Sequence, residues 1–119
     1  MKMPGANHLI KIAPQPKRVK VTFNGQTIAD TTQALELREG MSPPVQYIPR
    51  SDVAMERLQP TQHSTHCPYK GDASYFSITV DGKTAENAIW SYENPDQAVE
   101  QIKEYLAFYP NRVDGIEMI

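Results

Sequence analysis

Residues 18–31 read RVKVTFNGQTIADT, and this stretch indicates the fold more directly than any other. Val19, Val21 and Phe23 alternate with polar residues, which is the period of a strand with one buried face. Asn24-Gly25 follows at once, and both residue types tolerate the positive φ that a type I′ turn requires. We therefore predict a β-hairpin whose return strand covers residues 26–31.

Similar short segments recur along the chain. They are alternating or apolar, and they occupy residues 34–38, 45–48, 63–69, 75–80, 87–92, 106–109 and 113–118. Asp81-Gly82 supplies a second hairpin turn between two of them. Because strands and hairpin turns dominate and no βαβ alternation occurs, we predict a mainly β domain built from antiparallel sheets.

Two helical segments and one arm complete the predicted organisation. Ser51 can cap a short helical turn over residues 51–58, which Pro60 would end. Asn94-Pro95 favours the start of an α-helix near residues 95–103, because asparagine caps well and proline suits the first helical position. Residues 1–17 contain several prolines and no clean period, so we expect an N-terminal tail or ordered arm before a single domain over residues 18–119.

Composition excludes several classes of protein. A chain of 119 residues is long enough for one buried core. Its formal net charge of -2 argues against a nucleic-acid platform, which needs a positive face. No apolar run approaches the roughly 20 residues of a membrane span. The single cysteine excludes an internal disulfide and fits a reducing compartment, so we expect a soluble cytoplasmic domain without nucleic-acid or membrane partners.

Reactive side chains gather in residues 65–71, which read THCPYKG. In one interpretation Cys67 is a nucleophile whose thiolate is stabilised by Lys70. In the other it is a small, partly buried side chain that lines a pocket without covalent chemistry. The spacing shows no partner set of histidine and carboxylate, which favours pocket lining.

A metal site at this block is not expected. In an extended strand His66 points away from Cys67, while His63 lies about 13 Å from Cys67 along the strand. Zinc ligands must approach the ion to about 2.0–2.3 Å, so these side chains cannot share one ion without a tight turn. We predict no metal and no other cofactor.

Cationic and aromatic residues define the candidate ligand pocket. If they share one concave face, they would suit a small polar or anionic metabolite. The predicted ligand-binding residues are Arg50, Thr65, Cys67, Tyr69, Lys70 and Tyr75. Some of the residues can have a structural role instead of a role in ligand binding. Trp90 and Tyr92 can belong to the core, and Arg50 can form an ion pair with Asp52 or Glu93.

Several ordered blocks resemble a known family. They are YIPRSDV at residues 47–53, T-x-CPYKG-x-ASY at 65–75, A-x-WSYE-x-P at 88–95 and IK-x-YLAFY at 102–109. Together they resemble the bacterial domain of unknown function 427, also labelled nucleotidyltransferase-like, over residues 18–116. The resemblance implies packed antiparallel sheets similar to the β-tent (Mss-four-like) or sandwich folds. Members of that architecture hold zinc with paired Cys-x-x-Cys knuckles, which one cysteine cannot supply.

Three functions follow as hypotheses. The favoured one is a module that binds a small polar or anionic ligand near residues 65–71. The second is a small enzyme that uses Cys67, or Lys70 with tyrosines, as nucleophile or acid–base group; no Gly-rich phosphate loop or magnesium-binding aspartate pair supports the nucleotidyltransferase label. The third is a homodimeric interaction domain joined along an edge strand.

Overall fold

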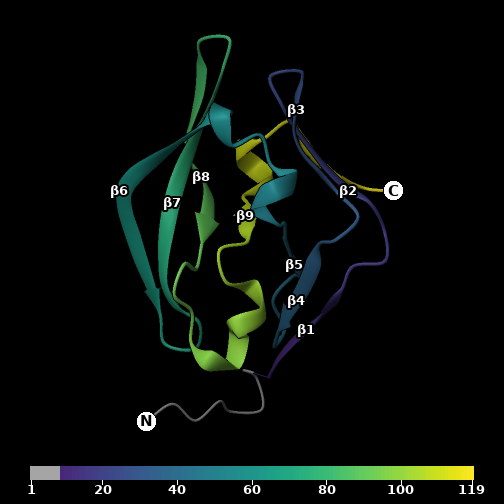
Figure 1. Ribbon diagram of the computed structural model, residues 1–119, viewed down its shortest axis with the longest axis vertical. Helices are drawn as coiled ribbons and strands as arrows, with labels where there is room; N and C mark the ends of the chain where they lie inside the picture. Colours follow the sequence, from purple (N-terminus) through teal and green to yellow (C-terminus); the bar gives the residue numbers. More distant parts are fainter. Residues whose placement is uncertain (1–8) are drawn as a thin grey trace.

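The computed structural model describes residues 9–119, which form mainly strands in three antiparallel sheets (Figure 1). One sheet has the order β1-β4-β5, from Ile10–Pro14, Leu35–Glu39 and Val45–Tyr47. A second has the order β10-β2-β3, from Gly115–Met118, Val19–Phe23 and Gln26–Thr31. The third has the order β6-β7-β8-β9, from Leu58–Cys67, Gly71–Val80, Lys83–Ser91 and Leu106–Phe108. The predicted mainly β, antiparallel class is confirmed.

Both predicted hairpin turns are present. Asn24 and Gly25 have φ values of 48° and 78°, and they join β2 to β3 as expected. Asp81 and Gly82 have φ values of 50° and 82° and join β7 to β8. Positive φ at both central positions matches the twist of the paired strands, so these local sequences fix the register of their hairpins.

Gly82→Ala is expected to destabilise the protein by about 1–2 kcal/mol, the cost of left-handed backbone for a residue with a Cβ. No atom lies within 4 Å of a Cβ built on Gly82, so steric contact adds nothing to that cost. Urea denaturation of both proteins measures the change. Gly115→Ala is the matched control, since its Cβ also meets open space and its φ is not in the positive range. Equal effects at the two positions would contradict the prediction.

The segment near residues 95–103 is helical as predicted, but it is not an α-helix. The segment is a 3₁₀ helix, η4 (Gln97–Ile102), and Val99 interrupts it with φ -125° and ψ 29°. Val99 and Ile102 are both fully buried, and 3₁₀ geometry places residues three apart on the same side. The backbone N–H groups of Asp96 and Glu104, on either side of the segment, donate to the carbonyls of Lys70 and Tyr92, so contacts distant in the chain hold both of its ends.

The predicted helical turn over residues 51–58 is divided into two 3₁₀ turns. These are η2 (Arg50–Asp52) and η3 (Met55–Arg57). Val53 lies between them and forms an isolated bridge with Ala29 of β3, which pulls the chain into extended conformation. A further 3₁₀ turn, η5 (Pro110–Arg112), follows β9.

The sheets begin before residue 18. Ile10–Pro14 of the predicted arm form β1, which pairs with β4. Pro14 is tolerated because β1 is an edge strand, where a missing N–H donor does not interrupt a ladder. Residues 1–8 of the predicted arm lie outside the described residues.

Two apolar clusters occupy opposite faces of the four-stranded sheet. The first is formed mainly by aliphatic residues, among them Val19, Val21, Ile28, Ile78, Val80, Ile89 and Leu106. The second contains tyrosines, and its buried members are Leu37, Tyr47, Ala73, Tyr75, Tyr92, Val99, Ile102 and Ala107. Across residues 9–119, no helix has the length and apolar character needed to cross a bilayer.

Strand β9 connects the four-stranded sheet to the sheet formed by β1, β4 and β5. Leu106 packs in the first cluster and its neighbour Ala107 in the second, as expected for alternating side chains. The backbone N–H groups of Ile48 and Leu106 each donate to the other residue's carbonyl at 2.8 Å, which connects the end of β5 to β9. Figure 1 shows β9 between the β6–β7 side of the molecule and the side formed by β1, β4 and β5.

Candidate functional site

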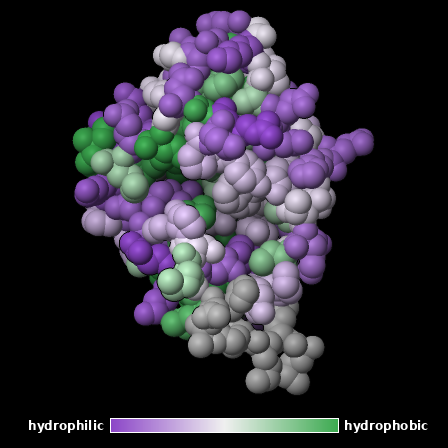
Figure 2. Space-filling model, turned by 180° about the vertical axis from the view of Figure 1, so that it is seen from behind, coloured by the Kyte–Doolittle hydropathy of each residue, from purple (hydrophilic) through white to green (hydrophobic). Residues whose placement is uncertain are grey.

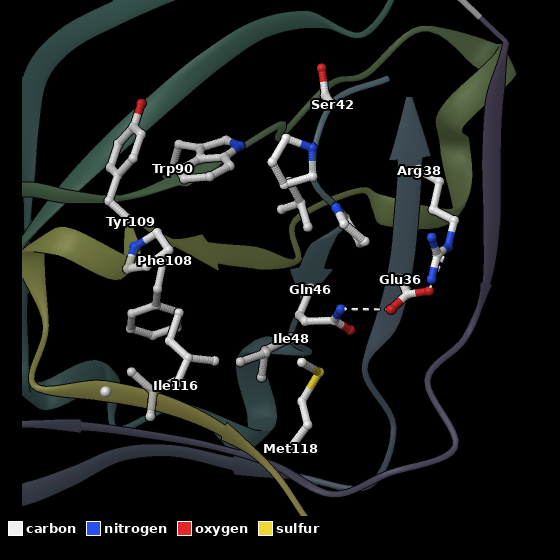
Figure 3. A pocket seen from close by; sticks show the side chains of 16 residues that line it. Glu36, Arg38, Ser42, Gln46, Ile48, Trp90, Phe108, Tyr109, Ile116 and Met118 are labelled. Atoms are coloured by element: carbon white, nitrogen blue, oxygen red, sulfur yellow. Dashed lines mark hydrogen bonds and ion pairs between the residues drawn. The ribbon is translucent and has the colours of Figure 1, made fainter. Parts of the chain in front are cut away.

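A large hollow lies between the three sheets. We call it the cleft; its volume is about 960 Å³. Strands from every sheet contribute to its walls, together with the loop before β5. The lining residues are Val21, Glu36, Arg38, Ser42, Pro43, Pro44, Val45, Gln46, Ile48, Trp90, Phe108, Tyr109, Pro110, Gly115, Ile116 and Met118 (Figure 3).

One wall of the cleft is aromatic. The ring centroids of Trp90 and Tyr109 are 4.5 Å apart with an interplanar angle of 45°, and Phe108 lies beside them (Figure 3). Ile48 and Ile116 continue the apolar lining. Seen from behind, apolar residues also gather on the side of the molecule that carries the C-terminus (Figure 2). The cleft therefore offers flat and apolar surface to a ligand.

Polar residues occupy the opposite side of the cleft. Glu36 accepts hydrogen bonds from Gln46 Nε2 at 2.9 Å and from Arg38 Nε at 3.0 Å (Figure 3). The bond from Gln46 is the main cause of the lowered pKa of Glu36, and Arg38 contributes further. This side of the cleft thus presents a carboxylate whose charge is balanced by a guanidinium.

A smaller hollow adjoins the cleft. We call it the inner pocket; its volume is about 210 Å³. It shares Val45, Trp90 and Tyr109 with the cleft, so the two hollows have a common wall. Its other lining residues are Leu37, Glu39, Tyr47, Lys70, Tyr75 and Tyr92.

An ion pair defines the inner pocket. Lys70 Nζ donates to Glu39 Oε1 at 2.5 Å, and the side chains are 10% and 19% exposed. Burial acts to lower the pKa of Lys70, but the hydrogen bond to Glu39 and the nearby Cys67 outweigh it, so the pKa is raised. Lys70 Nζ also lies 6.0 Å from the centroid of the Tyr92 ring. Lys70 is therefore a buried, charged and paired ammonium group.

The Cys-Pro-Tyr-Lys-Gly sequence holds Lys70 in place. Lys70 N–H donates to the carbonyl of Cys67, and the carbonyl of Lys70 accepts from Asp96 N–H at 3.0 Å. Gly71 has φ 110°, a conformation that L side chains rarely adopt, and it packs against the backbone of residues 94–96. The corner between β6 and β7 is thus anchored to the segment before η4.

Three tyrosines around the pair, Tyr47, Tyr75 and Tyr109, take part in side-chain hydrogen bonds. Tyr75 OH bonds to Thr65 Oγ1 at 2.9 Å and to Tyr109 OH at 3.3 Å, and Tyr47 OH accepts from Trp90 Nε1 at 3.2 Å. Burial is the main cause of the raised pKa of Tyr47 and of Tyr92. Burial, followed by the bond with Tyr75, raises the pKa of Tyr109 to about 12. Burial thus favours the neutral form of Tyr47, Tyr92 and Tyr109.

The structure brings together most of the residues that the sequence analysis selected. Lys70 and Tyr75 line the inner pocket, and Thr65 supports Tyr75 through its hydroxyl. Cys67 is half-buried and packs against the tyrosine-containing cluster. Tyr69 is half-buried in the β6–β7 turn and is not among the residues that line either hollow.

Arg50 lies apart from this group. Its guanidinium donates to Glu104 O at 2.8 Å, Glu93 Oε2 at 3.1 Å and Ser91 Oγ at 3.2 Å. Ser91 and Trp90 are adjacent in β8 and point to opposite faces, so Arg50 is on the far side of the sheet from the inner pocket. The structural alternative, a pair between Arg50 and Glu93, is the arrangement observed.

Trp90 was expected in the core together with Tyr92. Tyr92 is buried as expected, whereas Trp90 is only half-buried because one side of its ring faces the two hollows. Glu39 and the apolar residues of the cleft were not among the residues predicted from the sequence. No sequence pattern near Glu39 indicates that it pairs with Lys70, because the two residues are 31 positions apart in the chain.

The histidines near Cys67 have other neighbours. The His63 ring contacts Tyr75 with centroids 4.4 Å apart, and His66 Nδ1 pairs with Asp72 at 2.7 Å. Within residues 9–119, no group of three or more histidine, cysteine, aspartate or glutamate side chains is placed to hold a metal ion.

Comparison with known proteins identifies the family. The model of the family described as "Domain of unknown function (DUF427)" matches residues 11–118, which is nearly the whole chain and includes both hollows. No curated protein matches the chain. The protein therefore belongs to the DUF427 domain family.

Proposed function

We propose that the protein binds a small organic molecule with a planar, apolar body in the cleft. The observation that carries this proposal is the cleft itself, whose volume of about 960 Å³ is bounded by side chains from all three sheets. Sites for small molecules are typically concave, about 300–1,000 Å³ in volume and mainly apolar, with a few polar groups that fix orientation. The cleft matches that description.

The aromatic wall supports a planar ligand in particular. Trp90 and Tyr109 offer ring faces and edges to a flat molecule, and aromatic contacts favour offset-stacked or edge-to-face geometry. Hydrogen bonds anchor both side chains, from Trp90 to Tyr47 and between Tyr75 and Tyr109. Anchored side chains lose little further conformational freedom when a ligand binds, which supports affinity.

The apolar probe N-phenyl-1-naphthylamine tests the proposal. It is neutral, and its fluorescence rises in apolar surroundings. We expect saturable binding at one site, together with a change in the emission of Trp90, the only tryptophan of the chain. Met118→Glu should weaken this binding about tenfold or more, because the bound probe would desolvate the new carboxylate. Met118 lines the cleft and is 48% exposed, so the substitution should leave the fold intact.

Met41→Glu is the matched control. Met41 is 95% exposed and does not line the cleft, and this variant introduces the same charge as Met118→Glu. Its affinity for the probe should equal that of the wild type. The proposal fails if the wild type shows no saturable binding, or if the two variants bind the probe equally.

A further inference from the structure

The sheet face on the polar side of the cleft carries two cations and one carboxylate. Lys11 of β1 is paired with Arg38 of β4, and residues paired in an antiparallel ladder have their side chains on the same face. Glu36 lies two positions before Arg38 and shares that face, and both residues line the cleft. The strand partners of Glu36, Ala13 and Gln46, are uncharged. Among the described residues of β1, β4 and β5, positive charge therefore exceeds negative charge on this face.

The Glu36 carboxylate is fixed by three hydrogen bonds from the protein. Its Oε1 accepts from Gln15 Nε2 at 3.1 Å and from Gln46 Nε2 at 2.9 Å. Its Oε2 accepts from Arg38 Nε at 3.0 Å. Gln15 is buried, and the Glu36 side chain is only 20% exposed. Glu36 is thus a rigid support that holds Arg38 in place and neutralises one of the two cations.

Arg38 keeps most of its hydrogen-bonding capacity. A guanidinium has five N–H donors, and the bond to Glu36 uses the single donor on Nε. Within residues 9–119, its two Nη groups donate to no side chain or carbonyl, and the exposed Lys11 has no ion pair. Like charges directly opposite on paired strands repel each other. An anion bound beside Arg38 and Lys11 would relieve that repulsion.

The cleft joins this cationic region to the aromatic wall. Figure 3 shows Trp90 and Tyr109 at one end of the cleft. Glu36 and Arg38 lie at the other end, with Gln46 between the two regions. A molecule with a flat apolar body and an acidic group at one end matches both regions, and it needs only residues that lie around the same hollow.

Resting on the proposed function, we infer that the cleft selects planar aromatic carboxylates. The aromatic body lies against Trp90 and Tyr109, and the carboxylate accepts hydrogen bonds from the Nη groups of Arg38. The planar fork of a guanidinium matches the two oxygens of a carboxylate. Lys11 adds a second positive charge at the rim. Arg38 is thus the specificity-determining residue, and Glu36 is a positioning residue.

Calorimetric titration with two matched compounds tests the inference. 3-(2-Naphthyl)propanoate and 3-(2-naphthyl)propanamide have the same shape and differ in the charge of the end group. At an ionic strength of about 10 mM, we expect the acid to bind about fivefold tighter than the amide, the upper range for a solvent-exposed ion pair. At about 1 M salt the ratio should fall to about twofold or less, because salt screens exposed charges.

Arg38→Gln should lower the ratio of acid to amide affinity to about twofold or less at low ionic strength. A general distortion of the cleft would weaken both compounds and leave the ratio unchanged, so this readout is specific to the charge. Arg38→Lys should retain part of the preference, because it keeps the charge but loses the planar fork. Arg57→Gln is the matched control: it removes the same charge, and Arg57 lines neither hollow. Its ratio should equal that of the wild type.

The possible results separate this inference from the proposed function. If the naphthylamine probe binds the cleft but the acid and the amide bind equally at low ionic strength, the inference is overturned and the proposed function stands. A preference for the acid that persists in Arg38→Gln also overturns it, because another group would then hold the carboxylate. If neither the probe nor the two compounds bind, the proposed function fails, and the inference fails with it.

Discussion

Leu106→Ala is expected to lower the free energy of unfolding by about 4 kcal/mol. This value lies within the range typical of truncating a buried leucine to alanine in a tightly packed core. Leu106 is completely buried in the first apolar cluster. It lies in β9, which pairs with β8 on one side and bridges to Ile48 on the other, so its surroundings are held by hydrogen bonds and cannot easily collapse into the cavity. Urea denaturation would measure the loss, with the same m-value (the dependence of the unfolding free energy on urea concentration) for both proteins.

Leu9→Ala is the control for this prediction. It removes the same atoms at a position that is 59% exposed, and its effect should stay within about 0.5 kcal/mol. A loss of less than about 1.5 kcal/mol for Leu106→Ala would contradict the role of β9 as the joint between the sheets, because the site would then have repacked freely.

The elements that could be predicted from the sequence are those fixed by neighbouring residues. The type I′ turns at Asn24-Gly25 and Asp81-Gly82 depend on the φ preferences of two residues, and both occur. Strand alternation around them depends on a two-residue period. The helix predicted near residues 95–103 had good local capping residues, but Val99 has non-helical φ and ψ, and both ends of the segment are bound to the carbonyls of Lys70 and Tyr92.

The arrangement of the sheets depends on contacts that are distant in the chain. Ile10 is paired with Glu39, and Ile48 forms its bridge with Leu106. No local propensity encodes such pairings, so neither the three-sheet arrangement nor the cleft between the sheets could be derived from periodicity. The β-tent assignment implied by the family resemblance stays a prediction.

The candidate site also depends on contacts between residues that are distant in the chain. The block at residues 65–71 forms the corner between β6 and β7, and its Lys70 lines the inner pocket. Its partner Glu39 comes from β4, and Arg50 lies on the opposite face of the four-stranded sheet. A strand's period tells which residues share a face, but not which face of which sheet surrounds a cavity.

Lys70→Met is expected to lower the free energy of unfolding by about 3 kcal/mol at pH 7, the lower end of the range for breaking a buried ion pair. The methionine keeps most of the volume of the side chain but leaves the Glu39 carboxylate, 19% exposed, without its ammonium partner. The double variant Lys70→Met/Glu39→Leu should recover most of the loss, because replacement of a whole buried pair by apolar groups is often neutral. A double variant as unstable as Lys70→Met would show that packing, rather than the loss of the ion pair between Lys70 and Glu39, causes the destabilisation.

The pH dependence of this loss provides an independent check. The pKa of Lys70 is raised in the folded protein, so the stabilisation that it contributes is complete below the pKa of an unfolded lysine, about 10.4, and disappears as the pH rises through the higher folded pKa. The difference in unfolding free energy between the wild type and Lys70→Met should therefore be constant from pH 7 to about 9.5 and shrink above about pH 10.5. Tyr47 and Tyr92 also have raised pKa values, but both proteins contain them, so their effect largely cancels in the difference. A difference that is the same at pH 7 and at pH 11 would mean that the charge of Lys70 does not stabilise the fold.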